Sequence, residues 1–163
     1  MATEPDTPAR LALAEERVPN GEFARQRNAY LSGMLRWEQL DALWQRVLAA
    51  PQGWYVSQEG EAPPESPLQA DALCHFVTEL DALLRREHEH DYCGLAYADD
   101  PGQPALIKVF DPHHMGSFCG CSSVPIPPRW VLSRSRPERI GGEAPAPAAR
   151  RHWWSRLFPG STG

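Results

Sequence analysis

The sequence lacks any run of about 18 uninterrupted apolar residues, the length that a helix needs to cross a bilayer. Its first ten residues include Glu4 and Asp6, whereas a secretory signal carries positive charge ahead of an apolar segment. These two absences predict that the chain neither spans a membrane nor is exported. We therefore expect a cytoplasmic protein.

Cysteine is also scarce, with four among 163 residues. Outside a secretory context, so few cysteines indicate reduced thiols or metal ligands rather than a disulfide framework. Three of the four lie between His88 and Cys121, together with four of the six histidines. Because thiolate and imidazole bind transition metals and act as nucleophile and base, this segment is the first candidate for a site.

The net charge of −5 is distributed unevenly. Residues 1–128 contain nine basic and nineteen acidic residues, a balance of −10, whereas residues 129–163 contain seven arginines and two glutamates, a balance of +5. The acidic body would repel phosphates, so we expect no nucleic-acid partner. The basic end favours contact with a protein partner or with an anionic membrane surface.

Apolar residues at helical spacing predict two amphipathic helices. The first ends near Ala50, because Pro51 cannot continue it, and residues 31–35 extend the same pattern backwards. The second begins with Ser66 as N-cap, a proline at the first helical position and Gln69 placed to close a capping box.

Short apolar runs separated by turn residues predict the strands. Two of them form a β-hairpin over about 92–110, and single strands are expected near 53–57 and 130–133. Helices and hairpins in this order indicate an α+β fold, a small antiparallel sheet with two or three helices packed on one face and disordered termini.

Composition divides the chain into four parts. Residues 1–20 are interpreted as a mobile leader and residues 21–136 as a single α+β domain. Residues 137–149 are rich in proline, alanine and glycine, which predicts a linker, and residues 150–163 form a basic aromatic tail.

The tail is predicted to dock on a partner or, peripherally, on the inner face of a membrane, because aromatic rings and arginines suit both surfaces. The residues assigned to this contact are Arg150, Arg151, Trp153, Trp154, Arg156, Leu157 and Phe158. On this interpretation, deletion of residues 150–163 should leave the fold intact.

A metal site, with zinc as the candidate ion, is a second hypothesis. The start of the first strand of an antiparallel hairpin lies beside the end of the second, which would gather soft and borderline ligands. Those ligands are Cys93, His113, His114, Cys119 and Cys121. Their spacing matches no standard structural zinc motif.

A cysteine-dependent hydrolase or transferase is the third hypothesis. Cys119 or Cys93 would attack, His113 or His114 would act as the base, and Asp111 would orient the imidazole. No family-specific signature surrounds either cysteine.

The turn His88-Glu89-His90-Asp91 resembles a chelating cluster, but it follows a predicted helix. We interpret it as a charged, solvated turn, since histidine is favoured near the negative end of a helix dipole.

These patterns favour a non-catalytic accessory or adaptor protein that binds a partner protein and assists the assembly or maturation of a redox or metal-containing complex. The alternatives are the cysteine-dependent enzyme and a zinc-stabilised interaction module.

Overall fold

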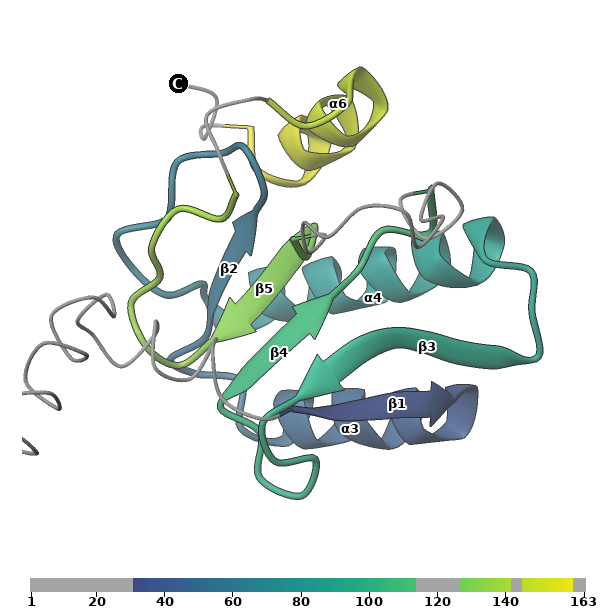
Figure 1. Ribbon diagram of the computed structural model, residues 1–163. Helices are drawn as coiled ribbons and strands as arrows, with labels where there is room; N and C mark the ends of the chain where they lie inside the picture. Colours follow the sequence, from purple (N-terminus) through teal and green to yellow (C-terminus); the bar gives the residue numbers. More distant parts are fainter. Residues whose placement is uncertain (1–30, 114–126, 142–144, 160–163) are drawn as a thin grey trace, which may run out of the picture.

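The computed structural model of the chain describes residues 31–113, 127–141 and 145–159 (Figure 1). Five strands and three helices lie within these ranges. In chain order they are β1 (Ser32–Arg36), α3 (Trp37–Ala49), β2 (Tyr55–Gln58), α4 (Ala70–Glu87), β3 (Tyr92–Ala98), β4 (Leu106–Val109), β5 (Trp130–Ser133) and α6 (Ala148–Leu157).

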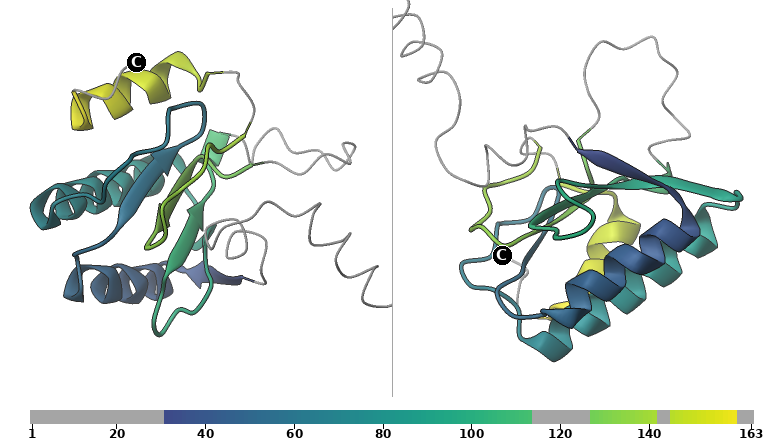
Figure 2. Two further views of the ribbon diagram at one scale, coloured as in Figure 1. Left: turned by 90° about the vertical axis from the view of Figure 1, so that its left-hand side faces the viewer. Right: turned by 90° about the horizontal axis from the view of Figure 1, so that it is seen from below.

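The five strands form one sheet in the order β1-β3-β4-β5-β2, and all neighbouring pairs are antiparallel. Helices α3 and α4 lie side by side on one face of it (Figure 2). The predicted α+β fold is therefore confirmed, with the hairpin of β3 and β4 inside the sheet and short strands close to 53–57 and 130–133.

The hydrophobic core lies between the sheet and these two helices. Both predicted apolar helix faces point into it, and their side chains meet the tryptophans at the start of β2 and β5. The fully or almost fully buried residues of the helices are Leu40, Leu43, Trp44 and Val47 in α3 and Leu73, Phe76, Val77, Leu80, Leu83 and Leu84 in α4.

The prediction that the first helix extends back through residues 31–35 is wrong. Ser32–Arg36 form the edge strand β1, and the helix begins at Trp37. Gly33 pairs with Tyr97 of β3, and a Cβ at Gly33 would come within 2.9 Å of the Tyr97 ring. The absence of a side chain at Gly33 lets that ring lie against β1, a contact that a helix would lose.

The predicted start of the second helix at Ser66 is also wrong. Helix α4 begins at Ala70, with Gln69 as its N-cap residue and no capping hydrogen bond from a side chain. The N–H of Leu68 instead donates to the carbonyl oxygen of Trp54 at 2.8 Å. This hydrogen bond holds the residues before α4 in an extended path against the segment that leads into β2.

Strand β3 contains a bulge at Gly94, where φ is +67°. Met34 pairs with Ala96, but Arg36, two residues further along β1, pairs with Tyr92, four residues earlier in β3. The extra residues bend β3, as Figure 1 shows. As a result the first part of the strand leads towards the carboxyl end of α4.

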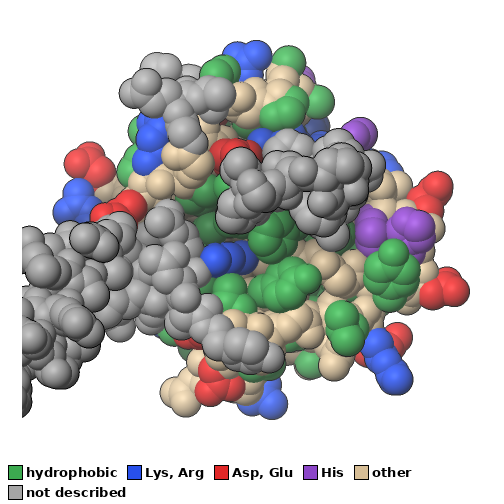
Figure 3. All heavy atoms as spheres, viewed as in Figure 1, with side chains coloured by type: hydrophobic (Ala, Val, Ile, Leu, Met, Phe, Trp, Pro, Cys, Tyr) green, Lys and Arg blue, Asp and Glu red, His purple; other side chains and the backbone are tan. Residues whose placement is uncertain are grey.

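No helix in the described ranges covers the second face of the sheet. Leu106, Val131 and Ile140 form a small buried cluster there. Tyr97 and Phe110 are half-buried beside it, with ring centroids 5.5 Å apart in an edge-to-face arrangement. Figure 3, which views this face, shows hydrophobic side chains distributed across it.

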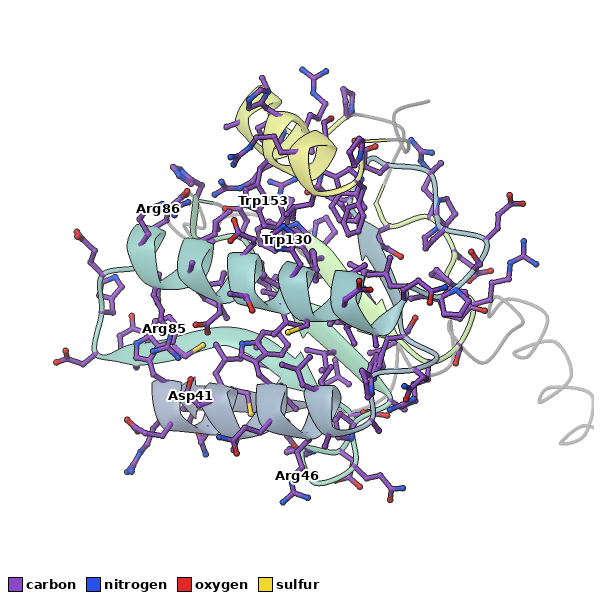
Figure 4. All side chains as sticks on the ribbon, turned by 180° about the vertical axis from the view of Figure 1, so that it is seen from behind. Asp41, Arg46, Arg85, Arg86, Trp130 and Trp153 are labelled. Carbon is purple, nitrogen blue, oxygen red and sulfur yellow. The ribbon has the colours of Figure 1, made fainter. Side chains whose placement is uncertain are left out.

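The C-terminal segment differs from the predicted disordered tail. Residues 148–157 form helix α6, in which Trp153 and Trp154 are each 5% exposed. Both indoles contact Phe76 of α4, and Trp153 also contacts Trp130 of β5 at a ring separation of 5.5 Å. Figure 4 shows Trp153 and Trp130 next to one another. Two adjacent tryptophans are costly to leave in water, and the contacts with Phe76 and Trp130 remove them from it.

The segment predicted as a linker also contributes to the interior. Ile140 and Ala146 are 2% and 4% exposed. The described parts of residues 127–159 therefore pack against the sheet and α4 and do not form a separate tail.

Replacement of Trp153 by alanine should lower the free energy of unfolding by about 3–5 kcal/mol, because it removes an aromatic side chain from a buried contact. Urea unfolding followed by circular dichroism measures the change. The matched control is His152→Ala on the exposed side of α6, with an expected effect within about 0.5 kcal/mol. Equally small effects of both substitutions, or an unchanged fold after deletion of residues 148–163, would contradict the packing of α6.

Candidate functional site

A buried charge junction joins the ends of β4, β5 and α6. The Asp111 carboxylate is 1% exposed and accepts hydrogen bonds from Arg129 Nε at 2.9 Å and Arg150 Nε at 2.8 Å, both on Oδ2. Its Oδ1 accepts from Arg150 Nη2 at 3.0 Å and from the backbone N–H of His113 at 2.9 Å. Every oxygen of this carboxylate is therefore satisfied within the protein.

Two further carboxylates form ion pairs with the two arginines. Glu59 Oε1 accepts from Arg129 Nη1 at 2.5 Å, and Glu87 accepts from Arg150 through both of its oxygens, at 2.6 and 3.2 Å. Burial alone would raise the pKa of Asp111, but the hydrogen bonds from Arg150, His113 and Arg129 outweigh it and hold that pKa well below its usual value. Burial lowers the pKa of Arg150, but its hydrogen bonds and its attraction to Asp111 and Glu87 raise that pKa by more, so the net shift is upward.

The junction connects residues on either side of the segment 114–126, which contains three of the candidate Cys/His residues. Asp111 and His113 precede that segment, and Arg129 follows it. His114, Cys119 and Cys121 themselves lie outside the described residues. Because the junction is buried and internally satisfied, we assign it a structural role rather than a ligand-binding one.

The structure separates the two described members of the proposed metal set. Cys93 is completely buried between the sheet and the helices, and burial raises the pKa of its thiol. His113 is 72% exposed, and its Nε2 lies 2.8 Å from Glu87 Oε1. Within the described ranges no three potential ligands gather around one point. These placements argue against Cys93 both as a metal ligand and as a nucleophile, since a sealed, protonated thiol serves neither role well.

The predicted docking residues of the tail divide between the inside and the outside of the fold. Arg150, Trp153 and Trp154 are committed to the interior by the contacts given above, whereas Arg151 and Arg156 are exposed. Leu157 and Phe158 are half-buried against the core. In this conformation the tail cannot present its tryptophans to a partner. No described helix has the length and apolar character needed to cross a bilayer.

A different surface collects the exposed apolar side chains. In the described part of the chain, only two large hydrophobic residues are classed as exposed, Leu35 at 63% and Tyr92 at 55%. Leu35 lies in β1 next to Arg36, the residue that pairs with Tyr92. We call the surface formed by Leu35, Trp37, His88, His90 and Tyr92 the aromatic end.

The rings of the aromatic end form a continuous cluster. The His88 imidazole centroid lies 4.6 Å from that of His90, 5.6 Å from Tyr92 and 6.1 Å from Trp37. Tyr92 stacks on His90, with 5.2 Å between centroids and 23° between planes. The Trp37 indole N–H donates to the carbonyl oxygen of His90 at 2.9 Å, which ties α3 to the turn after α4.

Arg85 fixes the inner wall of this cluster. Its guanidinium lies 4.8 Å above the Trp37 ring and donates to Asp41 at 2.6 Å and to Asp81 at 2.9 Å. Figure 4 shows Arg85 and Asp41 facing each other between α4 and α3. The ring of Trp37 is therefore held by a cation whose charge is already balanced.

His88 has an unusual environment within the cluster. Its Nε2 is buried without a hydrogen-bond partner in the described structure. Burial, followed by the neighbouring His90, lowers the pKa of His88, so the neutral imidazole is favoured at pH 7.

A surface hollow of about 310 Å³ lies at the aromatic end. Its lining residues are Trp37, Arg85, His88, Glu89, His90 and Asp91. Figure 3 shows histidine side chains gathered beside hydrophobic ones at the right-hand end of the sheet, with acidic side chains around them. The turn that the sequence indicates as merely solvated is thus part of an organised surface.

The sequence gives part of the signal for this surface. The His88-Glu89-His90-Asp91 turn is visible in it, as is the aromatic residue that follows. The contribution of Leu35 and Trp37 is not visible, because the sequence pattern predicts a helix over residues 31–35. Only the pairing of Arg36 with Tyr92 brings the junction of β1 and α3 to this end.

The chain has no significant match to any protein-family model, curated protein or solved structure.

Replacement of Asp111 by asparagine should lower the free energy of unfolding at pH 7 by about 3–5 kcal/mol, because Arg129 and Arg150 lose a buried counter-charge. The pKa of Asp111 is lower in the folded than in the unfolded chain, so its stabilisation is complete above about pH 4 and is lost as the pH falls through the folded value. Urea unfolding at several pH values below 5 should therefore show a flatter pH dependence for Asp111→Asn than for the wild type. The exposed Glu138→Gln serves as control, and parallel profiles for all three proteins would contradict the role of Asp111.

Proposed function

We propose that this chain is a non-catalytic accessory protein that binds a partner protein through the aromatic end. The observation that carries the proposal is the exposed ring of Tyr92, which stacks on His90 beside a hollow lined by indole and imidazole rings. Leu35, the other exposed large hydrophobic residue of the described chain, directly precedes Arg36, which pairs with Tyr92. Clustered exposed apolar side chains with a polar rim are typical of protein interaction sites.

The construction of the surface supports binding with little rearrangement. Trp37 is fixed by Arg85 and by its hydrogen bond to His90, and Tyr92 stacks on the same histidine. Side chains that are already ordered lose little conformational entropy when a partner binds. Aromatic residues in such positions contribute a large share of binding energy in known interfaces.

The catalytic alternative has less support. The burial and raised pKa of Cys93 make it a poor nucleophile, so a thiol enzyme would depend on Cys119, which lies outside the described residues. The density of cysteine and histidine between His88 and Cys121 favours a partner from a redox or metal-containing complex, and a cytoplasmic site of action remains part of the proposal.

Affinity capture from an extract of the source cells, quantified by mass spectrometry, tests the proposal with three forms of the full chain. These are the wild type, the double variant Leu35→Gln/Tyr92→Gln, and the control Arg151→Gln/Arg156→Gln on the exposed side of α6. We expect one partner to be retained by the wild type and the control, and to fall about tenfold or more with the double variant, because about 1.4 kcal/mol of contact energy is lost.

Circular dichroism and urea unfolding must first show that both variants are folded. Equal capture by all three forms would contradict the proposal. Loss confined to the α6 variant would instead favour the docking tail.

A further inference from the structure

We infer that the partner presents a basic segment to the aromatic end, with an arginine or lysine beside an apolar side chain. This inference rests on the proposed function and names the chemistry of its partner. It starts from the charges around the hollow, in which Glu89 and Asp91 are exposed lining residues. Within the described ranges neither carboxylate forms an ion pair, so both are free to receive a cation.

The cations near the hollow leave this negative charge largely uncompensated. Arg85, the basic residue in its lining, is neutralised by Asp41 and Asp81. Arg36 and Glu38 add one exposed positive and one exposed negative charge at the junction of β1 and α3. Arg86, in the last turn of α4, lies 3.9 Å from Glu87. Glu89 and Asp91 are therefore the charged lining residues without a counter-ion in the described ranges.

The end of helix α4 adds to this field. The helix ends at Glu87, directly before the turn that lines the hollow, so the negative end of its dipole is directed there. The positive dipole at the amino end of α3 lies nearby and opposes that of α4, so the carboxylates of Glu89 and Asp91 decide the sign of the local charge. A cationic side chain is favoured at such a position, whereas an anionic ligand would meet both the carboxylates and the dipole.

The aromatic rings suit the same occupant. Tyr92 exposes more than half of its surface, and guanidinium groups pack flat against aromatic rings. The chain already contains this arrangement in Arg85 above Trp37. Leu35 is exposed one residue before Arg36, the β1 partner of Tyr92, which places apolar area on the strand next to this ring. Charge, ring geometry and exposed apolar area thus converge on one class of partner.

A peptide titration of the ¹⁵N-labelled full chain, followed by NMR at pH 7 in the presence of EDTA, tests the inference. The probe is acetyl-Ala-Arg-Leu-Arg-Ala-amide, and its matched control replaces both arginines with glutamates. We expect the basic peptide to shift the Trp37 indole N–H and the backbone signals of residues 88–92, and the acidic peptide to leave them unchanged. Binding of the basic peptide should weaken markedly in about 0.5 M salt, where surface charges are screened.

The double variant Glu89→Gln/Asp91→Asn should bind the basic peptide about fivefold more weakly, the effect of roughly 1 kcal/mol of lost surface ion pairing. The control variant Glu61→Gln/Glu65→Gln removes two carboxylates from the connector after β2 and should bind as the wild type does. Equal shifts with both peptides, no shifts with either, or unchanged affinity of the double variant would overturn the inference.

The same double variant separates this inference from the proposed function. If Leu35→Gln/Tyr92→Gln loses the captured partner while Glu89→Gln/Asp91→Asn retains it fully, the aromatic end is the binding surface and the basic class of partner is wrong. If neither variant loses the partner, the proposed function itself fails.

Discussion

The arrangement of the second half of the chain depends on the hydrogen-bonded ion pairs of the Asp111 carboxylate. This carboxylate joins Arg129 at the start of β5 to Arg150 in α6, and through Arg150 it reaches Glu87 at the end of α4. Buried ion pairs add little net stability, because desolvation opposes the attraction, but removal of one member leaves charges that nothing else can satisfy. We therefore infer that the junction selects this packing of α6 over alternatives rather than supplying most of its energy, which comes from Trp153 and Trp154.

The aromatic end depends on a different constraint, the bulge in β3. Gly94 adopts a positive φ, and a Cβ there would lie 3.5 Å from the Tyr92 ring. The bulge turns Tyr92 away from the regular strand path and towards His88 and His90, which follow α4. A backbone irregularity in the sheet thus places an aromatic ring on a turn that would otherwise carry only charged residues.

The sequence predicts those parts of the fold that are governed by local periodicity. The apolar faces of α3 and α4 and the hairpin of β3 and β4 follow from spacing alone, because each repeats its pattern over several residues. Residues 31–35 are ambiguous, since Leu31, Met34 and Leu35 fit a helix as well as a strand, and only the pairing with β3 decides. The Asp111–Arg150 contact spans 39 residues and has no local signal at all.

The burial of the predicted docking tail and the exposure of apolar side chains at the aromatic end have one physical cause. Exposed tryptophans indicate a docking tail only if no apolar surface of the same chain can receive them, and here Phe76 and Trp130 provide that surface. Among the described residues, no apolar surface covers Leu35 and Tyr92, which lie in the edge strand β1 and at the start of β3. The described fold removes the indoles of Trp153 and Trp154 from water and leaves the apolar area of Leu35 and Tyr92 exposed, which is the observation that the proposed function uses.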